Sequence, residues 1–508
     1  MRRSVVIAVL ALGGAAPMVP AAVVAQESVP AAAYARAEAL LPQHVRKLIP
    51  GLSVRPRWIG ETSRFWFEKQ TRDGREYLLV DAAAGTSRPL FDLAALASAL
   101  GAATGKPVEP KELRLPGLRV DARTGLLRFL HAGKSWEYDP GARALAADRD
   151  TLGGDVSPDG QWRAVVRAGN LFLISTQDGR ERQLTTDGTT ESPYATPVVD
   201  PKIMIAQGTQ HPVMQPLLTW SPDSRRIATF RLNQTGARRL ALVQSTPPGG
   251  DAPRVFQYVY TLPGDTATAV ARGLFFDVAT GARTEMTLPP DPVLYYFGPY
   301  YQWSADGKAV FVRLTERGYQ RLQLYRVDAA TGEARVLSED RSDTYLDTWT
   351  QFWFYDDKTD MVYWTADQTG WFQLYGIDPR SGGRRALTTG DWVVRSVAGV
   401  NKASGTLLVI GTGREPGRDP YLRHLYSLPG RGGPIRLLTP EALDHDVSVS
   451  PDGRFFVDNM SFIDQPTRSV LRSTDDGRVL MELDRADISA FLAAGYLLPE
   501  PFESMAAD

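Results

Sequence analysis

Residues 445–457 read His-Asp-Val-Ser-Val-Ser-Pro-Asp-Gly-Arg-Phe-Phe-Val, a tight-turn sequence between two β-prone runs. Proline presets the backbone of such a turn, aspartate caps it through its side chain, and glycine takes the position that needs a positive φ. The flanking residues are mostly β-branched or aromatic, which is typical of strands. This stretch therefore predicts two antiparallel strands joined by a tight turn.

The same pattern recurs along the chain. Related turns occur at 157–160, 221–224 and 304–307. A second pattern, a strand that ends in a turn, occurs at 324–332 and 374–382, and weaker copies are spread over the rest of the chain. Several copies lead into a third run that begins Arg-x-Leu-Thr, at 182–185, 385–388 and 436–439. The repeated unit is thus a meander of short strands.

One meander cannot bury its faces alone, whereas radial repetition lets each unit cover the next. Turn centres near 60, 121, 157, 221, 304, 356, 401 and 450 predict an all-β, eight-bladed β-propeller. The first two units are degenerate, so a seven-bladed ring is the alternative. Trp220, Trp303 and Trp392 are expected to pack between blades. Two long stretches, 186–219 and 246–300, are expected to be loops or insertions on one rim.

Short helices are expected to flank the propeller. Residues 31–48 carry apolar side chains at helical spacing and end before Pro50-Gly51, and residues 487–496 form a second candidate. Almost no helix is expected between them.

Composition excludes several classes of function. The 508 residues carry a formal net charge of −1, so no basic field would gather nucleic acid. The absence of cysteine excludes disulfides and thiolate zinc sites. The five histidines form no metal-binding pattern. We therefore expect no cofactor, no metal site and no nucleic-acid partner.

The N-terminus is typical of an export signal. Arg2 and Arg3 precede an apolar run at 5–16 that is too short to span a bilayer, and small residues at 23 and 25 predict cleavage before Gln26. No later apolar stretch is long enough to span a membrane. Residues 1–25 are thus predicted to be a signal peptide, and the mature chain is predicted to be periplasmic or secreted.

The ordered series of motifs resembles the N-terminal region of the dipeptidyl peptidase IV branch of the prolyl oligopeptidase family, from about Tyr34 to Asp508. The resemblance rests on the turn quoted above, on Gly370-Trp371 with Leu374-Tyr375, on 387–394 and on the tail 498–502. Gln373 stands where that family usually has histidine. The resemblance implies a helical segment at 26–51, a propeller at 52–485, and a linker at 486–508 toward an α/β-hydrolase domain.

Such peptidases combine a propeller, which restricts access and helps to hold the substrate, with a hydrolase that carries a Ser-Asp-His triad. The nucleophile of that hydrolase needs Gly-x-Ser-x-Gly. Gly-x-Ser occurs here only at Ser53, Ser87 and Ser135, and none continues to x-Gly. We therefore expect no catalytic residue in this chain, which should be inactive alone, and expect the hydrolase domain downstream or in trans.

The resemblance also points to a substrate-binding loop. Dipeptidyl peptidases of this family bind the substrate ammonium with a Glu-Glu pair before a Trp-Ser-Pro turn. The corresponding window, 187–220, has no such pair, and its acids are Asp187, Glu191 and Asp200. We predict that Glu191, with Tyr194 on the same loop, contacts a peptide terminus. The alternative is a solvated acid beside a packed tyrosine.

Two functions follow. The first is a non-catalytic, substrate-gating and substrate-binding propeller of a secreted dipeptidyl peptidase IV-like serine peptidase. The alternative is a free-standing periplasmic propeller that binds a peptide or protein partner.

Overall fold

The computed structural model describes residues 29–148, 154–250, 252–292, 298 and 300–506. The predicted signal peptide, residues 1–25, lies outside these described residues.

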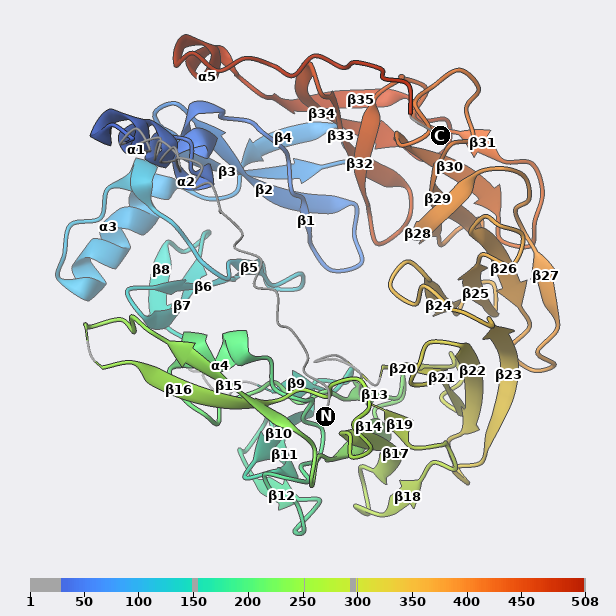
Figure 1. Ribbon diagram of the computed structural model, residues 1–508. Coiled ribbons are helices and arrows are strands. Elements are labelled where there is room, and N and C mark those ends of the chain that lie inside the picture. Colours follow the sequence, from blue (N-terminus) through green and yellow to red (C-terminus); the bar gives the residue numbers. More distant parts are fainter. Residues whose placement is uncertain (1–28, 149–153, 251, 293–297, 299, 507–508) are drawn as a thin grey trace, which may run out of the picture.

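Eight antiparallel sheets follow one another around a ring in chain order (Figure 1). Blade 1 consists of β1 (Arg57–Trp58), β2 (Arg64–Thr71), β3 (Gly74–Asp81) and β4 (Thr86–Pro89); blade 2 of β5 (Arg119–Val120), β6 (Leu127–His131), β7 (Lys134–Asp139) and β8 (Ala144–Ala147). Blade 3 consists of β9 (Asp155–Val156), β10 (Trp162–Arg167), β11 (Asn170–Ser175) and β12 (Glu181–Gln183). Blade 4 consists of β13 (Thr219–Trp220), β14 (Arg226–Asn233), β17 (Val270–Asp277) and β18 (Arg283–Glu285), with β19 (Asp291–Pro292) paired to β17.

The second half of the ring has the same plan. Blade 5 consists of β20 (Tyr301–Trp303), β21 (Ala309–Thr315), β22 (Arg321–Asp328) and β23 (Ala334–Arg341); blade 6 of β24 (Trp353–Asp356), β25 (Met361–Ala366), β26 (Gln373–Ile377) and β27 (Arg384–Ala386). Blade 7 consists of β28 (Val393–Asn401), β29 (Thr406–Thr412), β30 (Arg423–Pro429) and β31 (Arg436–Leu437); blade 8 of β32 (Asp444–Val449), β33 (Phe455–Phe462), β34 (Gln465–Ser473) and β35 (Val479–Arg485). The eight-bladed prediction is confirmed. Every predicted turn centre falls at the junction of a blade's first and second strands.

The Ser-x-Asp turns share one set of hydrogen bonds. The hydroxyl of Ser157 donates to the carboxylate of Asp159 at 2.6 Å, and the same oxygen accepts from the backbone N–H of Trp162 at 3.0 Å. The turns that begin at residues 221, 304 and 450 repeat both bonds. In one of them Ser224 replaces the final glycine and takes a φ of 61°, and its hydroxyl accepts from the backbone N–H of Asp159. This bond links blade 4 to blade 3.

Large apolar side chains fill the spaces between blades. Trp303 of blade 5 packs on Phe275 of blade 4 with ring centroids 5.5 Å apart. Trp220 shares a buried cluster with Leu171 of blade 3, and Trp392 shares one with residues of blade 6. The predicted position of the three tryptophans between blades is confirmed.

Blade 8 meets blade 1 without sharing a strand. The backbone N–H of Val54 donates to Asn459 Oδ1 at 2.8 Å, and Asn459 Nδ2 donates to the carbonyl of Val54 at 3.0 Å. Trp58 Nε1 donates to Ser448 Oγ at 3.1 Å. Apolar residues of both blades form one buried cluster at this seam. The ring is therefore closed by side chains.

The helices differ in part from the sequence-based expectation. Instead of one helix at 31–48 there are α1 (Ala31–Ala39), α2 (Pro42–Val45) and the 3₁₀ turn η1 (Arg46–Leu48). The break falls at Leu41, which takes an extended conformation (ψ 144°) because proline disfavours the helical region for the residue before it. The second flanking helix is α5 (Ser489–Ala493), shorter than predicted.

Helix also occurs where almost none was expected. These elements are α3 (Leu93–Thr104), α4 (Pro201–Gln207) and the 3₁₀ turn η2 (Pro110–Glu112). Asp92 caps α3 by accepting from the backbone N–H of Ala95, and Leu96 and Leu100 are buried in the cluster shared by blades 1 and 2. The helix exists because this apolar stripe covers the edge between those blades.

A two-stranded arm is inserted between β14 and β17 of blade 4. It consists of β15 (Arg239–Gln244) and β16 (Arg254–Val259), which pair with each other and with no blade strand. The two ends of the arm are adjacent, because the N–H of Tyr260 donates to the carbonyl of Arg238 at 3.0 Å. The prediction that 246–300 is a loop or insertion is therefore only partly right: the insertion is a β-hairpin that begins at 239, and β17 and β18 within 246–300 are strands of blade 4.

Candidate functional site

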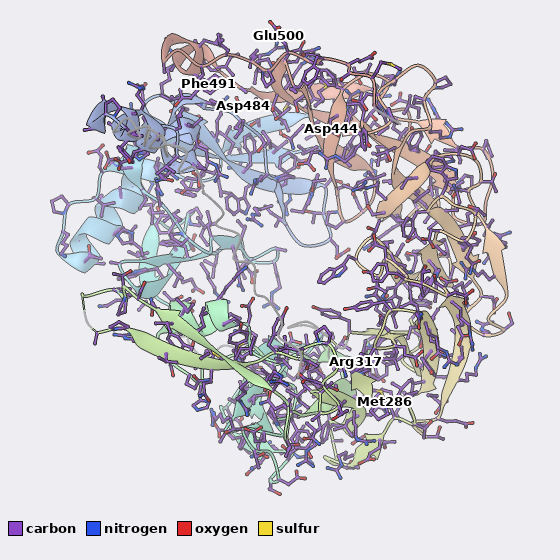
Figure 2. All side chains as sticks on the ribbon, in the orientation of Figure 1. Met286, Arg317, Asp444, Asp484, Phe491 and Glu500 are labelled. Atoms are coloured by element: carbon purple, nitrogen blue, oxygen red, sulfur yellow. The ribbon has the colours of Figure 1, made fainter. Side chains whose placement is uncertain are left out.

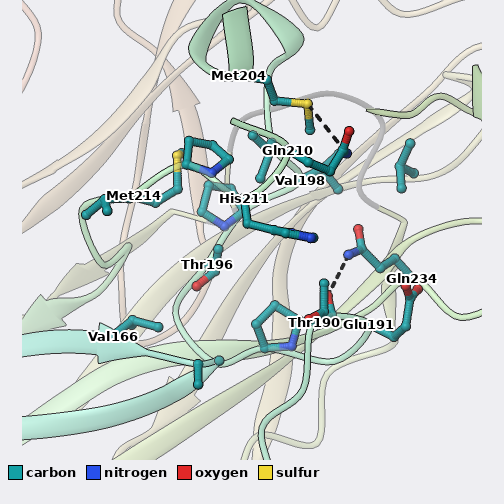
Figure 3. A pocket seen from close by; sticks show the side chains of 18 of the residues that line it. Val166, Thr190, Glu191, Thr196, Val198, Met204, Gln210, His211, Met214 and Gln234 are labelled. Atoms are coloured by element: carbon teal, nitrogen blue, oxygen red, sulfur yellow. Dashed lines mark hydrogen bonds between the residues drawn. The ribbon is translucent and has the colours of Figure 1, made fainter. Parts of the chain in front are cut away.

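A cavity of about 1170 Å³ lies between blade 3 and the arm. Its walls are the inner end of blade 3, the loop after β12, α4 with the segment that follows it, and one face of the arm (Figure 3). Apolar lining residues include Val166, Val198, Met204, Met214, Val255 and Val259. Polar ones include Glu191, Gln210, His211, Gln215, Gln234 and Arg239. The cavity is thus an apolar trough with amide groups and one ion pair on its walls.

The loop after β12 is fixed because it runs antiparallel beside β14. The N–H of Gln234 donates to the carbonyl of Glu191, and the N–H of Leu232 donates to the carbonyl of Pro193. Gln234 Nε2 also donates to the carbonyl of Thr190 at 2.8 Å, as Figure 3 shows. The backbone around Glu191 therefore has a defined place at the cavity wall.

Glu191 lines the cavity, but its charge is already neutralised. Arg239 Nη2 donates to both of its carboxylate oxygens, at 2.8 and 3.0 Å. The side chain of Glu191 is 44% exposed and that of Arg239 is 34% exposed, so the pair is accessible to a ligand. The sequence could not reveal this partner, because Arg239 lies on the inserted arm.

Tyr194 lies behind the cavity wall and does not line it. Its side chain is buried, and its hydroxyl donates to Asp187 Oδ1 at 2.8 Å and accepts from Arg283 at 2.9 Å. Arg231 stacks on the ring, 5.1 Å from its centroid, and pairs with Asp187 at 2.8 Å. The hydrogen bond from Tyr194, helped by Arg231, holds the pKa of Asp187 below its ordinary value. In this structure Tyr194 anchors the loop that carries Glu191; its predicted contact with a peptide stays a prediction.

The third acid of the window has a structural partner as well. Asp200 is the N-cap of α4, and its carboxylate accepts from the backbone N–H of Lys202 at 2.8 Å. Met204 on α4 lines the cavity, and the helix itself carries no acidic residue. Within the described part of the window 187–220, each acid is therefore engaged separately and no carboxylate pair is formed.

The arm forms the wall that sequence analysis missed. The N–H of Gln257 on β16 donates to Gln210 Oε1 at 2.9 Å, which ties the arm to the segment after α4. The signal for it was a pair of short apolar runs, at 240–243 and 255–259, on either side of the turn sequence Pro247-Pro248-Gly249-Gly250. The chemistry of the finished cavity suits an extended peptide, since apolar walls take side chains and amides take backbone groups. Among the described residues, no cluster of three or more histidine or acidic side chains is placed to hold a metal ion.

Residues 137–467, more than half of the chain, match the family described as the dipeptidyl peptidase IV (DPP IV) N-terminal region. The chain belongs to this family. Over 336 residues it is 24% identical to a protein of Aspergillus fumigatus named "Probable dipeptidyl peptidase 4", covering 62% of this chain and 41% of that one. The protein of the same name from Aspergillus clavatus is 25% identical over 287 residues, covering 54% of this chain and 35% of that one.

A dipeptidyl peptidase IV N-terminal region thus accounts for most of the chain, and the chain spans about two-fifths of the length of these curated relatives. The fold is also found in a solved structure. The crystal structure of Porphyromonas gingivalis dipeptidyl peptidase 4 superposes with a TM-score of 0.67 at 17% identity, covering 89% of this chain and 62% of that one. In the part of the chain that the structure describes, no helix has both the length and the apolar character needed to cross a membrane.

Proposed function

We propose that this chain is the non-catalytic, substrate-gating and substrate-binding propeller of a secreted dipeptidyl peptidase IV-like serine peptidase. The observation that carries the proposal is the cavity beside blade 3. It is built by the segment in which the family's dipeptidyl peptidases hold the substrate terminus, and its apolar and amide lining suits a peptide. The partners are a peptide and an α/β-hydrolase domain, encoded downstream or supplied in trans, and the compartment is the periplasm or the outside of the cell.

The ion pair at the cavity wall defines how a peptide binds. An incoming ammonium at Glu191 must compete with a guanidinium that already holds both carboxylate oxygens. The cavity as it stands therefore favours side-chain contacts with the apolar walls, and recognition of a free amino terminus requires Arg239 to turn away. This makes the pair a control point for terminus recognition.

The binding experiment uses residues 26–508 and calorimetry with matched peptides that carry a free or an acetylated amino terminus. Arg239→Ala frees Glu191 and should increase the preference for the free terminus about tenfold. Glu191→Ala should abolish that gain when the two changes are combined. Glu482→Ala is the control, because its carboxylate pairs with Arg468 at 2.7 Å and lines neither cavity. Equal binding of both peptides by wild type and Arg239→Ala would reject terminus recognition at this site.

The catalytic assignment is tested separately. Acyl transfer needs a hydroxyl activated by a base and an oxyanion hole, and these 508 residues contain no Gly-x-Ser-x-Gly. The purified chain should therefore remain unlabelled by a fluorophosphonate probe and should hydrolyse no proline-containing dipeptide or tripeptide reporter. Fusion to a hydrolase domain encoded just downstream should restore turnover. Specific labelling of one serine in the isolated chain would contradict the non-catalytic role.

The gene context gives an independent check. We expect about 230–260 further codons, in this or a shifted frame, with Gly-x-Ser-x-Gly followed by Asp and His in the order of α/β-hydrolases. A terminator directly after the Asp508 codon would favour the free-standing binding protein instead.

A further inference from the structure

A second pocket, of about 860 Å³, is lined by residues of blades 1 and 2, among them both residues of each of the short strands β1 and β5. Figure 1 shows where these two strands lie. The pocket exists because β1 has only two residues whereas β2 has eight. Only Trp66 and Phe65 of β2 have a partner on β1, so Glu68 and Gln70 face open space. The chain before β1 forms the rim.

The charges in this pocket are unbalanced. Four arginines line it, Arg46, Arg55, Arg57 and Arg119, and we call it the arginine pocket. Among the described residues, none of these four side chains has a hydrogen-bond or ion-pair partner. The two lining acids are already engaged from outside the pocket: Glu68 with Arg75, and Asp484, labelled in Figure 2, with Lys69 at 3.3 Å. A net positive charge therefore remains.

The cavity beside blade 3 shows the opposite pattern. Its two arginines are both paired, Arg239 with Glu191 and Arg167 with Glu181 at 2.8 Å. The two arginines of the cavity beside blade 3 thus have ion-pair partners, whereas the four of the arginine pocket have none among the described residues.

The backbone segment that carries Arg55 and Arg57 is held in place by blade 8. Val54 is bonded through both backbone groups to Asn459, and Trp58 is bonded to Ser448, so blade 8 fixes both ends of this five-residue segment. Burial alternates along this segment, as it does in an extended chain. Val54 and Trp58 pack into the seam, whereas Arg55 and Arg57 are exposed on the other side.

Unpaired guanidinium groups on an anchored backbone are suited to oxyanions. Each offers a planar fork that matches a carboxylate or phosphate with two hydrogen bonds. Neighbouring cations repel one another, and a bound anion removes that repulsion. Trp58 also lines the pocket, and its bond to Ser448 of blade 8 holds its position.

We infer that the arginine pocket binds an oxyanion, and that the oxyanion is a carboxylate of an acidic peptide. The affinity for oxyanions follows from the unpaired arginines alone. The peptide as its source rests on the proposed function, in which peptides reach the inner side of the propeller. Free phosphate is the competing source of the same chemistry.

The test measures binding of an acetylated, amidated triglutamate peptide to residues 26–508 by calorimetry at 50 mM and 300 mM salt. The acetyl group removes the ammonium, so recognition of a free amino terminus at Glu191 plays no part in the result. Wild type should bind saturably at low salt and at least fivefold more weakly at 300 mM, because exposed charges are screened. The triglutamine peptide should not bind.

The variants locate the site. R55Q combined with R57Q should weaken triglutamate binding at least tenfold, and R119Q, on the opposite wall, should weaken it at least threefold. R114Q is the matched control, since Arg114 is exposed and close in sequence to the lining residue Leu115 but does not line the pocket. Its affinity should stay within twofold of wild type. Unchanged melting temperatures show that the variants are folded.

Three results would overturn the inference: no saturable binding of either triglutamate or inorganic phosphate at low salt, equal binding of triglutamate and triglutamine, or wild-type affinity in both R55Q/R57Q and R119Q. If phosphate binds in an arginine-dependent way and triglutamate does not, the oxyanion site stands and the peptide source is rejected.

Discussion

Thr185, Thr388 and Thr439 explain at the residue level why Arg-x-Leu-Thr repeats. In blades 3, 6 and 7 the threonine hydroxyl accepts from a backbone N–H near the start of the neighbouring strand: Leu171 at 2.9 Å, Leu374 at 2.8 Å and Leu425 at 3.0 Å. The residue before each of these leucines also bonds to the threonine side chain, and it is Gln373 in blade 6 and His424 in blade 7. Glutamine thus performs at 373 the hydrogen bonding that histidine performs at 424.

Replacing Thr388 by alanine should leave the N–H of Leu374 buried without a partner. An orphaned buried donor costs about 1–3 kcal/mol, so the free energy of unfolding in urea should fall by that amount. Thr388→Ser keeps the hydroxyl and should restore most of the loss. If serine and alanine destabilise equally, the methyl group and not the hydrogen bond is responsible.

Asp291 gives a pH-dependent prediction. Burial raises its pKa from 3.8 to about 7, and Arg313 only partly offsets this. Because the folded pKa lies above the unfolded one, the stabilising contribution is complete below about pH 4 and is lost as the pH rises through 7. At about 1.36 kcal/mol per pH unit the ceiling is about 4 kcal/mol, and partial exposure reduces the expected effect to about 1–3 kcal/mol.

Asp291→Asn cannot ionise, so its stability relative to wild type should improve by about 1–3 kcal/mol between pH 4 and pH 8 in urea unfolding. Asp306→Asn provides a control of opposite sign. The hydrogen bond from Ser304 holds the pKa of Asp306 below its ordinary value of 3.8, so that variant should lose relative stability as the pH rises toward about 5 and show no further change up to about pH 8. A pH-independent difference between wild type and Asp291→Asn would show that the carboxyl is solvated.

Among single residues, the sequence predicted the contacts between side chains that are close together in the chain. Ser157 and Asp159 are two residues apart, and their turn is visible in the sequence. Glu191 and Arg239 are 48 residues apart, and no short pattern joins them. The position of Glu191 on the candidate loop could be predicted, but its neutralisation could not.

Among the elements, the strands were predictable because each turn and strand repeats, and the helices and the arm were not. Pro42 ends α1 through its effect on Leu41, a local signal that the apolar spacing of 31–48 obscured. α3 lies in the connection between two degenerate blades. Its apolar face is buried only by packing against both of them, so the local sequence does not reveal it. The arm pairs with itself alone, so it follows none of the repeats.

The separate pairing of the arm leads to a deletion experiment. Replacing residues 239–259 by a short Gly-Ser turn joins ends that are already adjacent and leaves all strands of blade 4 in place. We expect one cooperative unfolding transition and a normal circular dichroism spectrum, with loss of at least tenfold in peptide affinity at the cavity beside blade 3. The matched control replaces the exposed turn residues Pro416 and Gly417, which line neither cavity. An unfolded deletion variant would show that the arm is part of the blade 4 core.

For the whole molecule, the number of blades follows from counting turns, but the closure of the ring does not. The bond between Val54 and Asn459 joins residues 405 positions apart, and neither residue belongs to a repeated pattern. Yet this seam determines the position of Arg55 and Arg57, because they lie between its two anchors. The contacts that close the ring are therefore the same contacts that position the arginine-bearing rim of the pocket.

Asn459→Ala tests that coupling. The change removes both bonds to Val54, which is 1% exposed, so two buried backbone groups lose their partners and unfolding should become easier by about 2–4 kcal/mol. Amide hydrogen exchange at 54–58 should accelerate at least tenfold, and triglutamate affinity should fall although every arginine is present. Ser469→Ala is the control: it removes only the bond from the serine hydroxyl to Asn459 Oδ1, at 2.7 Å, and should leave exchange at 54–58 unchanged. If Asn459→Ala costs less than about 1 kcal/mol and exchange is unaltered, the apolar cluster alone closes the ring.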